Sequence, residues 1–251
     1  MREKIYEPYD VIETCLLAGK IMLQSGAETY RVEDTMIRIA ASYGIDQAHS
    51  YVTPTGILFS IDGVEPTKLV RIVERSTDLQ KVTQVNGISR TISTGVLSPN
   101  EAIQQLKEIE REPHAYPVWI QIIAAAVSSG CFMLMFKGDW TDFIPACIAG
   151  GAGFACLLYF NHLLKVKFFA EFSASLVIGL VSFLFITLDV GKELDKIIIG
   201  SVMPLVPGLL ITNAIRDLMA GHLVSGISKG AEAFLTAFAI GSGIATVLSL
   251  F

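Results

Sequence analysis

The stretch from Gly200 to Asp217 contains the residues whose types and spacing suggest the most specific chemistry. Pro204, Pro207 and Gly208 lie within five residues of one another in an apolar run. Prolines remove hydrogen bonds from a helix, and the freed backbone groups are tolerated at membrane depth only when they are buried in protein or face water. Ends of broken helices often form the substrate site of a secondary transporter. A proline kink that only shapes packing is the competing interpretation.

Three polar residues follow this break at helical spacing. Asn213, Arg216 and Asp217 are related as i, i+3 and i+4, so they share one helix face. A guanidinium group binds a carboxylate through two parallel hydrogen bonds, and Asp217 could hold Arg216 or take a proton. The alternative is that Arg216 and Asp217 only mark the cytoplasmic end of a span. We predict a substrate or transport site made of Pro204, Pro207, Gly208, Asn213, Arg216 and Asp217.

Two glutamates at the ends of apolar stretches are further candidates. Glu171 lies near the start of one stretch and Glu232 lies just inside another. A carboxylate in lipid is costly unless it has a partner, so Glu171, Glu232 and Asp217 are predicted candidates for proton coupling. A plain interfacial glutamate is the alternative. His222 could titrate near neutral pH, but a loop histidine is more often incidental.

A second polar cluster lies near the N-terminus, at residues 26–33. Its sequence is Gly-Ala-Glu-Thr-Tyr-Arg-Val-Glu, at the start of a predicted helix. Glu28, Thr29, Arg31 and Glu33 are the candidate functional residues of this motif. Helix capping is the simpler role for Glu28 and Thr29.

The rest of the sequence argues against several other classes of protein. It shows no Ser/His/Asp or Cys/His set, no Walker lysine and no cluster of metal-ligand type, so we expect neither an enzyme nor a bound metal or cofactor. The net charge is −5 and basic residues are not clustered, which argues against nucleic-acid binding. The four cysteines form no CxxC pair and are interpreted as small apolar core residues.

Composition divides the chain into two halves. Overall 52% of residues are hydrophobic, 17% are charged and mean hydropathy is +0.54. Residues 1–114 carry 12 Lys/Arg and 16 Asp/Glu, against 7 and 8 in residues 115–251. The sequence therefore predicts an α-helical polytopic membrane protein of about five transmembrane helices, at 115–251, with an N-terminal cytoplasmic α+β domain at 1–114.

Local patterns predict the elements of the N-terminal domain. Apolar residues at helical spacing indicate helices near 10–24, 28–43 and 78–94. Ser98-Pro99-Asn100-Glu101 is a capping box that begins another helix. Short β-type runs at 51–53, 57–61 and 68–73 predict a small meander covered by helices. Residues 113–117, with two prolines, are the predicted hinge to the membrane.

The apolar stretches after residue 117 are each close to the 20 residues that a membrane-crossing helix needs. They lie at approximately 118–136, 143–164, 168–188, 197–215 and 230–250. No signal peptide opens the chain, so we expect the N-terminal domain in the cytoplasm. Six Lys/Arg on the inner flanks against three on the outer loops agree with this orientation. Five spans would put the C-terminus outside, and four spans with one re-entrant segment are the main alternative.

Several motifs in order resemble the threonine/serine exporter family. They are residues 26–33, Thr53-Pro-Thr-Gly56, the run from Pro204 through Gly208 to Asn213–Asp217, and Ser225-Gly226. The resemblance covers nearly the whole chain and implies a cytoplasmic domain joined to a bundle of spans that exports small carboxylate-bearing metabolites. His222 stands where many relatives are expected to have an acidic residue.

Single-chain members of this family fuse such a half to a second, shorter one. Because the chain ends at Phe251, it looks like the split, YjjP-like form, which the family associates with succinate export and with a separate, smaller membrane subunit. We therefore expect the larger subunit of a secondary transporter for threonine/serine or a dicarboxylate, in the bacterial cytoplasmic membrane. A homo-oligomer is the other assembly to consider. A membrane-anchored metabolite sensor or regulator is the alternative function.

Overall fold

The computed structural model describes residues 6–63, 65–112, 116–164 and 166–250. It divides into two compact units. The first unit comprises Met1–Ala115 and Ile211–Gly230, and the second comprises Tyr116–Leu210 and Ala231–Phe251. The predicted boundary at 114/115, and most of the predicted hinge at 113–117, lie outside the described residues.

Four helices form the bulk of the first unit. They are α1 (Pro8–Gln24), α2 (Thr29–Ser42), α3 (Leu79–Ser93) and α4 (Pro99–Arg111). The capping box at the start of α4 is present: Ser98 Oγ accepts the backbone N–H of Glu101, and Glu101 Oε2 accepts that of Ser98. Such reciprocal bonds satisfy two amides that the helix itself cannot pair.

The three predicted strands form one antiparallel meander. Strands β1 (Ala48–Thr53), β2 (Gly56–Ile61) and β3 (Glu65–Arg71) are adjacent in chain order. Ile57, Phe59 and Ile61 alternate along β2 and are buried, as expected for a sheet with one covered face. Strand β1 is at the edge of this sheet, so one row of its backbone groups has no strand partner.

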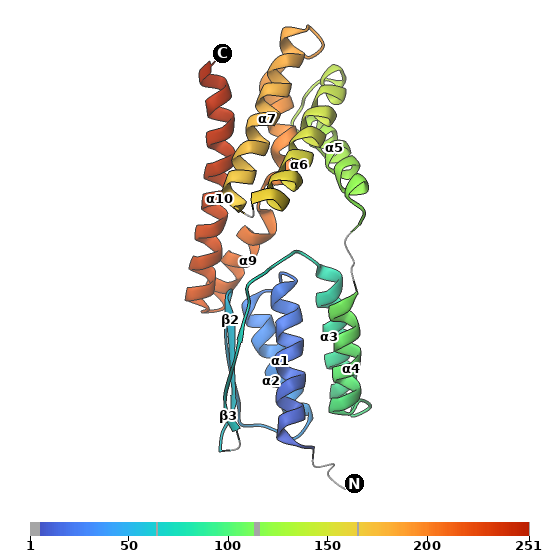
Figure 1. Ribbon diagram of the computed structural model, residues 1–251, viewed down its shortest axis with the longest axis vertical. Helices are drawn as coiled ribbons and strands as arrows, with labels where there is room; N and C mark the ends of the chain where they lie inside the picture. The colour runs from blue at the N-terminus through green and yellow to red at the C-terminus, as the bar shows by residue number, and fades with distance from the viewer. Residues whose placement is uncertain (1–5, 64, 113–115, 165, 251) are drawn as a thin grey trace. The chain divides into compact units, whose positions relative to one another are not determined.

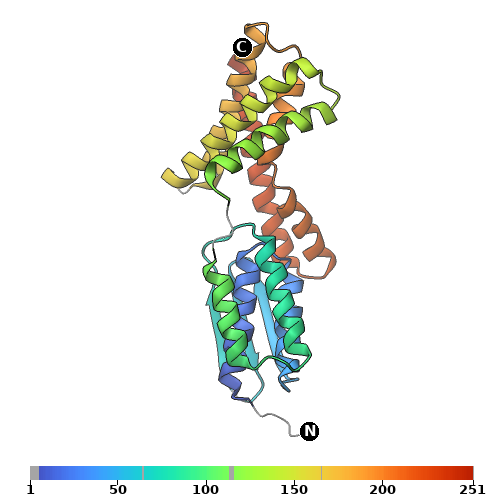
Figure 2. The same ribbon diagram turned by 90° about the vertical axis from the view of Figure 1, so that its right-hand side faces the viewer.

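The first unit is built in layers, which Figures 1 and 2 show from two directions. α1 and α2 cover one face of the sheet, and α3 and α4 lie on the far side of these two helices. The core between the layers is apolar, with Met22, Met36, Ile39, Phe59 and Leu106 fully buried. Met36 and Ile39 thus place α2 in the core of this unit.

A helical hairpin from late in the chain completes the first unit. α9 spans Gly208–Met219, α10 spans Leu223–Leu250, and residues 211–230 of this hairpin belong to the first unit. Gly221 has φ of +88°, and the amides of Gly221 and His222 return to the carbonyls of Leu218 and Asp217. This is a Schellman turn, which ends α9 and lets α10 begin at once. Residues 216–229, which lie between two of the predicted apolar stretches, are therefore mostly helical.

The second unit is a bundle of apolar helices. It contains α5 (Val118–Met135), the 3-10 turn η1 (Trp140–Asp142), α6 (Phe143–Leu164), α7 (Lys167–Thr187), α8 (Leu194–Val202), η2 (Met203–Leu205) and the greater part of α10. Within the described residues, four helices are long and apolar enough to cross a membrane, or five if the bent pair Leu194–Leu205 and Gly208–Met219 is one span. Both predicted span counts fall within this range.

Small residues allow the helices of the second unit to pack closely. A Cβ atom added at Gly150 would overlap Ser129 of α5, and one added at Gly153 would overlap Ile178 of α7. Gly200 of α8 lies against the backbone of Met133, where an added Cβ would be 2.8 Å from the amide nitrogen. This is the packing role that small residues have in membrane bundles.

Candidate functional site

The turn between α1 and α2 presents polar backbone groups to the rest of the first unit. Gly26 has φ of +88°, and the amides of Gly26 and Ala27 return to Leu23 and Met22, so a second Schellman turn ends α1. Glu28 is the N-cap residue of α2, but its side chain makes no capping hydrogen bond. The free amides at the start of α2 therefore need another acceptor.

Asp217 of α9 supplies that acceptor. Its Oδ1 accepts the backbone N–H of Thr29 at 2.9 Å, and its Oδ2 accepts Lys229 Nζ of α10 at 2.7 Å. Lys229 also donates to Thr29 Oγ1 at 3.1 Å. Asp217 and Thr29 are fully buried and Lys229 is 4% exposed. The buried carboxylate thus has a cation, an amide and the positive end of a helix dipole as partners.

Arg216 makes a second ion pair at the same helix start. Its Nη1 donates to Glu28 Oε1 at 2.5 Å, while Glu28 Oε2 lies 3.2 Å from Arg31 Nε. Glu28 is buried and the Arg216 side chain is 52% exposed. Asn213 Nδ2 donates to the carbonyl of Gly26 at 2.9 Å. One face of α9 therefore contacts the turn before α2 through all three of its predicted polar residues.

Glu33 connects α2 to the sheet edge and to the hairpin. Its Oε1 accepts the backbone N–H of Val52 at 2.7 Å, and His222 Nδ1 lies 3.7 Å from the same oxygen. Ser225 Oγ donates to the Val52 carbonyl at 3.3 Å. These bonds satisfy polar groups of β1 that have no strand partner. Burial raises the pKa of Glu33, although the Val52 amide and His222 oppose the shift.

The predicted break lies where α8 gives way to α9. η2 contains Pro204, Val206 is extended, and α9 starts at Gly208 after Pro207. Proline has no amide hydrogen, which explains why the ladder stops there. Pro204, Pro207 and Gly208 belong to the second unit, whereas Asn213, Arg216 and Asp217 of α9 belong to the first.

Glu171 and Glu232 belong to the second unit, where α7 and α10 form a four-residue polar cluster. Lys167 Nζ lies 2.8 Å from Glu232 Oε1, and Thr236 Oγ1 donates to Glu171 Oε1 at 3.2 Å. Glu171 is 6% exposed, and its Oε2 is buried with no hydrogen-bond partner among the described residues. An ionised oxygen in that state is costly, and a proton on it lowers the cost.

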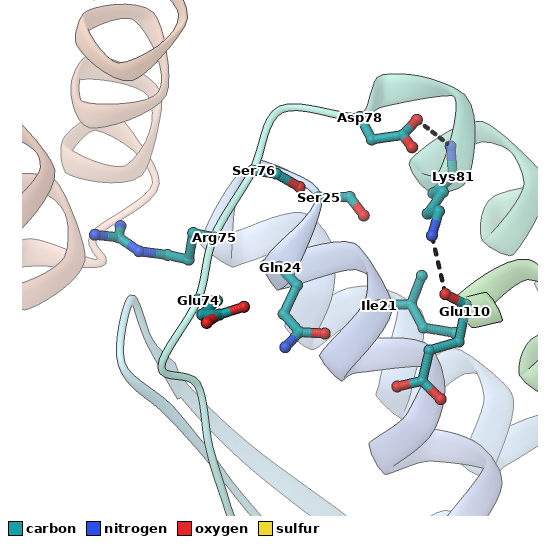
Figure 3. A pocket seen from close by; sticks show the side chains of 9 residues that line it. All are labelled: Ile21, Gln24, Ser25, Glu74, Arg75, Ser76, Asp78, Lys81 and Glu110. Atoms are coloured by element: carbon teal, nitrogen blue, oxygen red, sulfur yellow. Dashed lines mark hydrogen bonds between the residues drawn. The ribbon is translucent and has the colours of Figure 1, made fainter. Parts of the chain in front are cut away.

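A cavity of about 300 Å³ opens at the end of α1 (Figure 3). Lys81 donates from Nζ to the Glu110 carbonyl, and its backbone amide is accepted by Asp78. Glu74 also lines the cavity, whereas the side chain of Arg75 points away from it. No group of three or more metal-ligating side chains was found in the part of the chain that the structure describes.

The main residue that sequence reasoning missed is Lys229. In the sequence, Lys229 contributes only to the count of positive charges that favours the predicted orientation. The sequence does contain a pattern that indicates this role. Lys229 lies 12 positions after Asp217, near the start of an apolar helix, and such a lysine can pair with the aspartate across a tight helical hairpin. Val52 was also missed. It acts through its backbone amide and carbonyl, which every residue except proline has, so its residue type does not indicate the role.

Three proteins that this chain resembles are named as transporters or as a transporter subunit. The chain is 25% identical to the "Probable succinate transporter subunit YjjP" of Escherichia coli K12, over 96% of this chain and 94% of that protein. It is 23% identical to the "Threonine/serine exporter" of Corynebacterium glutamicum, over 92% of this chain but 49% of that protein. It is 22% identical to the "Probable threonine/serine exporter" of Mycobacterium tuberculosis, over 90% and 44% respectively.

No solved structure matches the chain. The model of the threonine/serine exporter family, ThrE, matches residues 13–251, which is nearly the whole sequence. This chain belongs to the threonine/serine exporter family.

Proposed function

We propose that this chain is the larger subunit of a secondary transporter that exports small carboxylate metabolites. The substrates are threonine and serine, or a dicarboxylate such as succinate, as the names of its relatives suggest. The transporter resides in the bacterial cytoplasmic membrane, with residues 1–114 in the cytoplasm. Four or five apolar helices and family membership support this proposal.

The observation that carries the proposal is the pairing of Arg216 with Glu28. Arg216 is half exposed, so part of its guanidinium group is available to a second carboxylate. A substrate carboxylate would compete with Glu28 for this group. Displacement of Glu28 would break the ion pair between α9 and α2. The hydrogen bonds among Asp217, Lys229 and Thr29 would still join the two helices. The site thus binds its substrate by exchange of one carboxylate for another.

Proton coupling is the role that we propose for Glu171. Its buried Oε2 has no partner among the described residues, and Lys167 of the same cluster pairs with Glu232. Protonation and release at Glu171 would alter the contact of α7 with Thr236 of α10. Asp217 is less suited to this role, because Lys229 and the Thr29 amide already stabilise its ionised form.

A second, smaller membrane subunit completes the transporter in this proposal. The relative from Escherichia coli is named a subunit and has about the length of this chain. The named exporters from Corynebacterium and Mycobacterium are about twice as long, so they contain a further half that this chain does not match. The smaller subunit would supply the equivalent of that half.

Efflux from loaded cells tests the proposed function. Cells that lack exporters of this family are loaded with labelled threonine or succinate and express this chain with or without a candidate small subunit. The proposal predicts faster efflux of one substrate only when both proteins are present. Equal efflux with and without this chain would refute the proposal, and full efflux by this chain alone would favour a homo-oligomer.

A further inference from the structure

A second cavity of the first unit lies between α2 and α3 and is lined by arginines. Its volume is about 500 Å³. The lining residues are Tyr30, Arg31, Asp34, Arg38, Asn86 and Arg90. Three of these six side chains are guanidinium groups and one is a carboxylate, so the lining carries a net charge of +2.

The arginines are only weakly neutralised. Arg38 Nη1 lies 3.2 Å from Asp34 Oδ2, but Asp34 is 67% exposed, and an exposed pair of this kind contributes little. Arg38 also donates to the neutral hydroxyl groups of Ser89 and Thr35. Arg90 has no ion pair with any residue that the structure describes. Arg31 shares Glu28 with Arg216, so one carboxylate serves two cations.

We propose that this cavity binds a small dianion, a phosphate ester or a dicarboxylate, as a regulatory ligand. Its volume is in the range of small-molecule sites. Guanidinium groups from two helices can each donate two hydrogen bonds to a pair of anionic oxygens. The two negative charges of a dianion also match the net charge of +2 on the lining. The Tyr30 ring and the Asn86 amide offer further contacts to the body of the ligand. The site is separate from the proposed transport site.

A ligand in the cavity would affect the contacts of Arg216, because Arg31 of the lining and Arg216 both pair with Glu28. Arg31 binds Glu28 on one oxygen and Arg216 binds it on the other. A dianion in the cavity attracts Arg31 away from Glu28 and leaves Glu28 to Arg216 alone. The Arg216–Glu28 pair then strengthens, which makes the Arg216 group harder for a competing carboxylate to capture. Ligand in the cavity would thus reduce the apparent affinity at Arg216.

The cavity at the end of α1 differs from this one in the charges of its lining. Its lining includes the acids Glu74, Asp78 and Glu110 against the bases Arg75 and Lys81, and Lys81 Nζ is bonded to a backbone carbonyl. Its charge balance does not favour a dianion. Of these two cavities, the one between α2 and α3 has the lining that suits an anion.

Calorimetric titration of the full chain in neutral detergent tests this inference. The probes are glycerol phosphate and succinate, with glycerol as an uncharged control. The expected result is saturable binding of at least one dianion that depends on Arg90, and no binding of glycerol at the same concentration. Arg90→Gln should weaken binding about tenfold or more, because it removes one charge-assisted contact.

Arg71→Gln is the matched control, since Arg71 is an exposed arginine of β3 that does not line the cavity. It should bind the dianion as the wild type does. The two dianion probes separate a phosphate ligand from a dicarboxylate ligand. Absence of dianion binding would overturn the proposal. So would equal binding by the Arg90 variant, the Arg71 variant and the wild type, or equally tight binding of glycerol. None of these readouts depends on export.

Discussion

The Oδ1 atom of Asp217 lies 2.9 Å from the backbone nitrogen of Thr29, although 188 positions separate the two residues. Asp217 comes from the helix that starts at the proline break, and Thr29 begins the helix of the N-terminal polar motif. Two motifs that stand at opposite ends of the sequence therefore form one buried contact. This contact, with the neighbouring Arg216–Glu28 pair, is the structural basis of the proposed transport site.

Replacement of Lys229 by methionine should destabilise the first unit strongly. The change leaves the fully buried Asp217 without its cation, a loss that typically costs about 3–5 kcal/mol. Thermal unfolding or limited proteolysis of the purified chain measures the effect. Lys167→Met removes the more exposed Lys167–Glu232 pair and should cost about 1 kcal/mol or less. Equal losses in the two variants would show that Lys229 and Asp217 are not a buried pair.

Glu33 should make stability depend on pH. Burial raises its pKa above the ordinary value of 4.5, so between the two values the folded chain keeps a proton that the unfolded chain has released. The free energy of unfolding therefore falls as pH rises through that window. Glu33→Gln retains an acceptor for the Val52 amide and should flatten this slope. The control is Glu108→Gln, at an exposed position of α4, which should leave the slope unchanged.

Glu171→Gln should separate export from the proton gradient. The amide cannot release a proton, so export should lose its dependence on the pH difference while the protein still inserts normally. Counterflow exchange, which needs no net proton movement, should persist. The comparison is Glu232→Gln, which alters the same cluster but keeps Glu171. If Glu171→Gln retains full pH-driven export in reconstituted vesicles, the proton is carried elsewhere.

Reporter fusions test the predicted topology. A fusion after Thr94 should report the cytoplasm, and one after Phe251 should report the exterior if the pair Leu194–Leu205 and Gly208–Met219 acts as one span. A cytoplasmic signal from both fusions would indicate an even number of crossings. The bent pair would then be a re-entrant segment rather than a span.

Much of the fold could be predicted from local pattern. The capping box at Ser98 sets the start of α4, and helical or alternating periodicity places α1 to α3 and the meander within a few residues. Hydropathy likewise places α5, α6 and α7, because these helices are apolar all round. These features depend on neighbours in sequence, which a pattern can report.

The arrangement of the site could not be predicted in the same way. The spacing of Asn213, Arg216 and Asp217 predicts a shared helix face, but not that Gly26, Glu28 and Thr29 are their partners. That pairing depends on two Schellman turns, at Gly26 and Gly221, and on an edge strand that needs partners for Val52. Such contacts span almost the whole chain, and residue type alone carries little information about them.

Export by Arg216→Lys and Glu28→Gln variants, measured against substrate concentration in vesicles, tests the central claim most directly. Lysine keeps the charge but loses the planar fork, so export at low substrate concentration should fall by about tenfold or more. Glu28→Gln removes the competing carboxylate and should lower the concentration needed for half-maximal export. Wild-type export by Arg216→Lys, at equal protein abundance, would contradict the account, because Arg216 would then bind no substrate carboxylate.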